Sequence, residues 1–67
     1  MELKGSQTEK QLWQAFAGES QARTKYTLWS ETARREGYEQ IGAIFEETAA
    51  NELAHAKMLF RFLGGLS

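Results

Sequence analysis

Apolar residues recur at intervals of three and four along two long stretches of the chain, which meet at Gly37. This spacing is the period of an α-helix and predicts two amphipathic helices. Its regularity over such a length favours long helices packed nearly parallel, as in a four-helix bundle. The first stripe contains Leu12, Ala15, Phe16, Glu19, Ala22, Tyr26, Trp29 and Ala33, and the second contains Ile41, Phe45, Thr48, Glu52, His55, Leu59 and Phe62.

Capping residues mark the ends of both predicted helices. Ser6 and Glu9 have the spacing of a capping box, with Thr8 as an alternative cap. Gly37 follows a polar helix end that carries two arginines, as a left-handed glycine cap does. The prediction is a helix over about 7–36, a turn at 37 and a helix over about 38–63 that stops at the glycine pair 64–65, forming a single half-bundle domain over 1–67.

The length of the chain points to a need for further stabilisation. At 67 residues it falls below the roughly 70–80 residues at which a single core supplies more than about 3–5 kcal/mol. It contains no cysteine, so disulfides, zinc ribbons, iron–sulfur centres and cysteine nucleophiles are excluded. The remaining sources of stabilisation are oligomerisation and a metal held by carboxylates and the single histidine.

The charge and hydropathy of the chain limit the kinds of molecule that it can bind. Eight basic and nine acidic residues are interspersed along the chain and give a net charge of −1, which argues against a nucleic-acid partner. No apolar run approaches the roughly 20 residues that cross a bilayer, and the first residues do not resemble a signal peptide. We therefore expect a cytoplasmic protein without a membrane partner.

Three ionisable residues stand within the apolar stripes. Glu19 precedes Gly37 by 18 residues, whereas Glu52 and His55 follow it by 15 and 18. At about 1.5 Å per residue all three lie roughly 22–27 Å from the turn, so an antiparallel hairpin brings them to one level. Glu52 and His55, three residues apart, share a helix face.

A divalent cation would explain these polar residues in an apolar stripe. Buried charges are rare unless they are paired or coordinate a metal, and oxygen ligands with an imidazole suit iron or manganese. One hairpin offers two carboxylates and one histidine, whereas two copies offer the ligand pattern of di-iron and di-manganese bundles. The alternative is that His55 is a core histidine hydrogen-bonded to Glu52. Arg23 either neutralises buried carboxylates or points outward.

Five segments of the chain carry a resemblance to a known family: LKGSQTEK (3–10), AFAGESQAR (15–23), EGYEQI (36–41), IFEETA (44–49) and NELAHAK (51–57). They resemble the first half of the ferritin-like domain of rubrerythrins, and the resemblance covers nearly the whole chain. It implies that Glu19, Glu52 and His55 match iron ligands, and that Tyr26 matches a tyrosine that supports them from outside the ligand set. It also implies reduction of hydrogen peroxide at a non-haem di-iron centre.

Three departures from that family qualify the resemblance. The second helix pair is missing, so the remaining ligands come from another chain or the sequence is a fragment. The four-cysteine rubredoxin domain is missing too, so an external electron donor is expected. Ala22 stands where the family's second half typically carries an additional glutamate.

The resulting expectation is an all-α helical hairpin that dimerises into a ferritin-like four-helix bundle with two iron ions, or manganese, per dimer. Its function would be that of a di-iron oxidoreductase acting on hydrogen peroxide or dioxygen. The alternatives are a ferroxidase in iron storage and a non-catalytic helical-hairpin dimerisation module.

Overall fold

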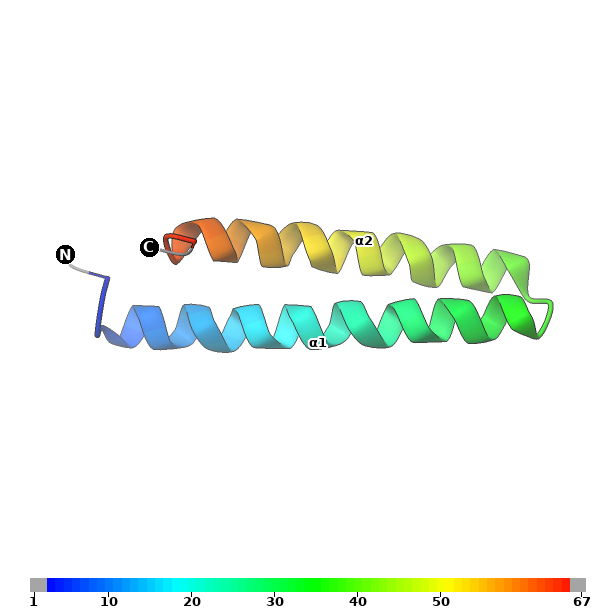
Figure 1. Cartoon of the computed structure of the whole chain (residues 1–67), viewed down its shortest axis with the longest axis horizontal. Coiled ribbons are helices and arrows are strands. Elements are labelled where there is room, and N and C mark those ends of the chain that lie inside the picture. The colour runs from blue at the N-terminus through cyan, green and yellow to red at the C-terminus, as the bar shows by residue number, and fades with distance from the viewer. Residues whose placement is uncertain (1–2, 66–67) are drawn as a thin grey trace.

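The computed structural model describes residues 3–65 as two antiparallel helices (Figure 1). Helix α1 spans Gln7–Arg35 and helix α2 spans Glu39–Phe62. The prediction of an all-α hairpin is therefore confirmed, and each predicted helix boundary lies within one residue of the observed one.

The first helix begins at a capping box built on Ser6. The hydroxyl Oγ of Ser6 accepts a hydrogen bond from the backbone N–H of Glu9 at 3.0 Å. The Glu9 carboxylate in turn accepts from the backbone N–H of Gly5 at 2.9 Å, one residue before the position in the standard motif. Ser6 is thus the cap, and the alternative, Thr8, lies inside the helix.

A Schellman motif ends α1 and starts the turn. Gly37 has φ +88°, a value that a residue with a side chain seldom adopts. Its N–H donates to the carbonyl of Arg34 at 3.0 Å, and the N–H of Tyr38 donates to the carbonyl of Ala33 at 2.8 Å. These bonds satisfy carbonyls that the helix end would otherwise leave without donors. A glycine pair ends α2 in the same way, with Gly65 donating to the carbonyl of Phe60 at 2.9 Å.

Small residues form the contact between the two helices, which we call the seam. Among the described residues the buried ones are Ser30, Ala33, Gly42, Ala49 and Ala56. Gly42, Ala49 and Ala56 follow one another at intervals of seven, so they share one face of α2. Side chains of this size let two helices approach closely.

The predicted apolar stripes are not the seam, and this is a correction. Of the residues assigned to them, only Ala33 is buried. Most of their large side chains lie on a neighbouring face, which we call the open face and define by Tyr26, Trp29, Ile41, Phe45, His55 and Phe62. The periodicity of large apolar residues identified this second face, because small seam residues contribute little to a hydrophobic pattern.

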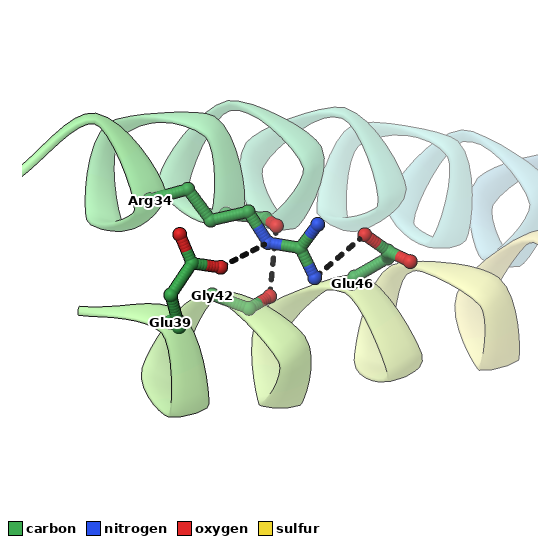
Figure 2. A network of polar contacts seen from close by, with 5 residues as sticks. Arg34, Glu39, Gly42 and Glu46 are labelled. Carbon is green, nitrogen blue, oxygen red and sulfur yellow. Dashed lines mark hydrogen bonds and ion pairs between the residues drawn. The ribbon is translucent and has the colours of Figure 1, made fainter. Parts of the chain in front are cut away.

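Close approach of the helices near the turn depends on Gly42. A Cβ atom there would lie 2.5 Å from Cγ of Arg34, so the Arg34 side chain would have to move. The carbonyl of Gly42 accepts a hydrogen bond from Oγ of Ser30 at 2.8 Å. Figure 2 shows the Arg34 guanidinium beside Gly42, between the carboxylates of Glu39 and Glu46. Its Nε lies 3.8 Å from Oε2 of Glu39, and its Nη2 lies 3.1 Å from Oε2 of Glu46.

The hairpin is a rod rather than a compact globule. Its principal extents are 51 × 15 × 14 Å, and its radius of gyration is 15.0 Å, compared with about 11 Å for a compact domain of this length. Its accessible surface of 5182 Å² exceeds by about a fifth the surface of a typical folded monomer of this mass. Neither helix carries a stretch apolar enough to cross a membrane within the part of the chain described.

Candidate metal centre

The three predicted ligands come together at mid-length of the hairpin. One ligand atom from each of Glu19, Glu52 and His55 can be chosen so that all three lie within 4.8 Å of one another. Glu19 projects from α1, whereas Glu52 and His55 project from α2 one turn apart. The antiparallel pairing set by the turn at Gly37 therefore produces the juxtaposition that the spacing predicted.

Glu19 carries the unsatisfied buried atom of this cluster. Its side chain retains 30% exposure, and Nδ1 of His55 lies 3.5 Å from its Oε2. That oxygen is itself buried and has no hydrogen-bond partner among the described residues. A buried carboxylate oxygen without a donor is costly unless a cation or a hydrogen bond compensates it.

The donor set fits a divalent transition metal. Two carboxylates and an imidazole are the ligand types of non-haem iron and manganese sites, and the arrangement contains no thiolate. Glu19, Glu52 and His55 would hold such an ion, which would compensate the orphaned Oε2 of Glu19. Three side chains from one chain leave coordination positions to be filled from elsewhere.

His55 is not a core histidine in this hairpin. Its side chain is 55% exposed, and its charged neighbour is Glu19 rather than Glu52. Exposure of the imidazole on the open face makes its nitrogen accessible to an ion or to a second chain. The alternative of a Glu52-paired core histidine is therefore wrong for the hairpin.

Arg23 does not neutralise the cluster in this structure. Its guanidinium donates a hydrogen bond to the hydroxyl of Thr27, one turn along the same helix. Together with Glu31 and Glu46 it lines a hollow that includes none of the three candidate ligands. Negative charge at the cluster is thus left for a cation to balance.

Tyr26 lies one heptad beyond Glu19 on α1, within an aromatic group. Its ring stacks on Phe45 with centroids 5.9 Å apart and meets Trp29 edge to face at 5.4 Å. These contacts hold the ring against α2 on the open face. A hydrogen bond from its hydroxyl to a ligand carboxylate stays a prediction.

Sequence reasoning placed Trp29, Ile41 and Phe45 in the apolar stripes and missed a groove at the turn end of the open face. The groove measures about 450 Å³ and is lined mainly by Trp29, Ala33, Tyr38, Ile41 and Phe45. The signal was present, since most of these residues belong to the predicted stripes. The exposure of Ile41, Trp29 and Tyr38, which ranges from 47% to 58%, could not be inferred from the spacing of apolar residues along the sequence.

Comparisons with known proteins identify the family of the chain. The family described as Rubrerythrin matches residues 10–67. The chain is 59% identical to a rubrerythrin of Porphyromonas gingivalis over 94% of its own length and 32% of the relative. It is 61% identical to rubrerythrin-1 of Clostridium acetobutylicum over 91% of the chain and 31% of the relative.

A nigerythrin of Nitratidesulfovibrio vulgaris is 52% identical over 72% of the chain and 24% of the relative. No solved structure matches. The chain thus spans about a third of the length of the rubrerythrins it matches. With 58 of its 67 residues inside the family match, the chain belongs to the rubrerythrin family and carries part of its di-iron domain.

Proposed function

We propose that two copies of this hairpin form a four-helix bundle that binds a pair of iron ions and reduces hydrogen peroxide. The observation that carries the proposal is the cluster of Glu19, Glu52 and His55, with ligand atoms within 4.8 Å, in a chain of the rubrerythrin family. Each copy would supply these three residues.

The need for a second copy follows from the ligand count. A di-iron bundle uses a glutamate from each of two helices and a Glu-x-x-His pair from each of the other two. One hairpin provides half of this set, from Glu19 on α1 and from Glu52 and His55 on α2. Two copies related by a two-fold axis complete it, and two-fold symmetry is the commonest arrangement of identical chains.

The open face supports this association physically. Large apolar side chains on it remain about half exposed, among them Trp29 at 48% and Ile41 at 47%. Covering such residues contributes roughly 25 cal/mol for each Å² of apolar surface removed from water. The elongated hairpin thus lacks a core of its own and would gain one by pairing.

Each residue of the site would have a distinct role. The carboxylates of Glu19 and Glu52 balance the charge of the cations, and His55 contributes a nitrogen ligand from each copy. The ring of Tyr26, which contacts Phe45 and Trp29, lies one heptad from Glu19, and its hydroxyl would orient a carboxylate, as groups around metal ligands commonly do.

An iron pair, when bound, supplies the two electrons that convert hydrogen peroxide, with two protons, into two waters. Repeated turnover would require electrons from a donor outside these 67 residues, which contain no cysteine with which to form a rubredoxin centre. Ala22 adds no further carboxylate on the first helix, so ligand exchange that depends on such a residue is not part of the proposal.

The test is stopped-flow oxidation of the anaerobically reduced, iron-loaded protein by peroxide and, separately, by dioxygen. We expect oxidation by peroxide to be at least tenfold faster than that of free ferrous ion, with turnover only when a donor is added. The Glu52→Ala variant is the control and should behave like free iron.

Other outcomes would favour the alternative functions. Accumulation of ferric mineral without peroxide turnover would replace the proposal with iron storage. Purified protein without metal, and without affinity for added ferrous ion, would leave a dimerisation module.

A further inference from the structure

The groove on the open face is preformed within one chain. Trp29 and Phe45 form its floor, with ring centroids 5.8 Å apart. Ala33 and Ile41 line it further toward the turn. Because these contacts lie within one hairpin, the groove exists before any partner arrives.

Phe62 is the exposed aromatic residue at the opposite end of the same face. Its relative exposure is 62%. It follows Ile41 by 21 residues and His55 by 7, so a heptad repeat places all three on one side of α2. In the isolated hairpin this ring has no place in the seam.

We propose that the groove receives Phe62 of a second copy of the chain, in a fixed register set by the metal ligands. This inference rests on the proposed function, since it takes the dimer and its centre as given. It adds the orientation of the two copies, their alignment along α2 and the side chain that fills the groove.

The symmetry of a shared site determines which helices face each other. A two-fold axis that lies between the two hairpins, perpendicular to their helices, places the two turns at opposite ends of the bundle. It also sets α2 antiparallel to the partner's α2. Both Glu-x-x-His segments then meet at the axis, as a shared pair of ions requires.

Register follows from the position of the ligands. Phe45 lies seven residues before Glu52, and Phe62 lies seven residues after His55. An axis through the middle of the Glu52–His55 pair therefore places the partner subunit's Phe62 opposite Phe45. Both lie about 10 Å beyond the ligands at about 1.5 Å per residue.

A second copy fits this groove better than an unrelated ligand does. Each hairpin presents one groove and one exposed Phe62, so the two-fold operation fills both grooves at once. An aromatic ring buries a large apolar area and packs well against other rings at centroid distances of about 4.5–7 Å. The walls formed by Trp29, Ile41 and Phe45 supply that environment.

Engineered cysteines test the register directly, because the natural chain contains none. In a Phe45→Cys/Phe62→Cys variant the two positions are 17 residues apart on one helix, about 25 Å. A disulfide needs Cα atoms within roughly 7 Å, so only a bond between copies can form. A second variant, Ile41→Cys/Phe62→Cys, leaves the aromatic floor intact.

The expected result is a covalent dimer, formed on mild oxidation in at least one of these two variants. Its rate should be at least tenfold that of the control Leu28→Cys/Phe62→Cys. Leu28 lies at a similar level on α1 and is 56% exposed, but it does not line the groove. Circular dichroism of each variant verifies that the helices are retained.

Four results would overturn the inference, and each has a distinct meaning. Equal crosslinking in the Leu28 control would show collisional contact only. Rapid crosslinking of Phe62→Cys alone would show that the turns lie at the same end. If neither test pair crosslinks while the wild type is dimeric and binds metal, the register is wrong but the proposed function stands. A monomeric wild type without metal would overturn both.

Discussion

The seam and the open face of this hairpin use opposite kinds of side chain. At the seam, Ala49 and Ala56 are 4% and 5% exposed, and Gly42 allows the helices to approach closely. On the open face, Trp29 and Phe62 remain 48% and 62% exposed. Small residues therefore close the contact within one chain, whereas the large apolar residues point toward a contact that one chain does not make.

This difference separates two levels of organisation. Tight turns and small seam residues fix the antiparallel pairing and so bring Glu19 to the level of Glu52 and His55. The open face carries exposed large apolar side chains, among them Trp29, Ile41 and Phe62, that have no partner in a single chain. Pairing of the helices thus assembles the half-site, and association would complete it.

Substitution of the metal ligands should have the largest effect. That effect should fall on metal binding at the open face and should leave helix packing at the seam largely intact. Replacing Glu52 or His55 with alanine should abolish stoichiometric metal binding, while circular dichroism retains most of the helical signal. Metal binding by the unaltered chain should also weaken at low pH, because carboxylates and imidazole must lose their protons to coordinate.

The matched control for these ligands is Glu47→Ala, an exposed glutamate outside the cluster. Elemental measurement should find its metal content unchanged. Metal content equal to that of the wild type in both ligand variants would show that the ligands have been misassigned.

Overfilling the seam should be the next largest effect. Ala49→Leu adds bulk where only 4% of the residue is exposed, and overpacking of a tight contact costs about 1–3 kcal/mol. Urea unfolding at one fixed protein concentration measures the loss. Ala50→Leu, at the exposed neighbouring position, should change the free energy of unfolding little; equal losses would mean that the seam is not the tight contact.

Removal of the helix cap tests the start of α1, away from both faces. Ser6→Ala removes the hydroxyl that accepts from Glu9 and should cost about 1 kcal/mol. The residue for comparison is Thr8, which is helical and exposed, so Thr8→Ala should not destabilise the protein. Thermal unfolding that ranks these two variants the other way would assign the cap to Thr8.

The ion pairs over the seam should contribute least. Arg34 and Glu46 are 3.1 Å apart, but their side chains are 41% and 65% exposed. Exposed pairs are worth at most about 1 kcal/mol, and salt at about 1 M screens them. Glu46→Gln should therefore lower the free energy of unfolding slightly at low salt and leave it unchanged at high salt. The loss at low salt should exceed that of the control variant Glu47→Gln. A loss that persists at high salt would point to a packing role for Glu46.

Much of the fold was predictable because local chemistry determines it. Ser6 and Gly37 have cap functions that follow from a hydroxyl and from a missing Cβ. Glu19, Glu52 and His55 could be grouped by counting residues from the turn. This procedure succeeds because two straight helices joined by a short turn leave little freedom in their relative register.

The seam was not predicted, for a physical reason. Ser30 and Gly42 bury little apolar area, so they are nearly invisible to a reading based on hydrophobic periodicity. The large side chains dominate that reading, and they report the face that an assembly would bury. Exposure of His55 was missed for the same reason, because its place in the stripe implied a core that one hairpin does not have.

The two tryptophans provide separate optical reporters of two levels along the hairpin. Trp13 and Trp29 are almost equally exposed, at 47% and 48%. Trp13 packs edge to face against Phe16 near the chain ends, whereas Trp29 forms part of the groove. Covering the groove would move the emission of Trp29 to shorter wavelength, and Trp13 would report separately on the end of the hairpin where the chain ends lie. With one tryptophan replaced by phenylalanine at a time, intrinsic fluorescence alone would follow association of the open face.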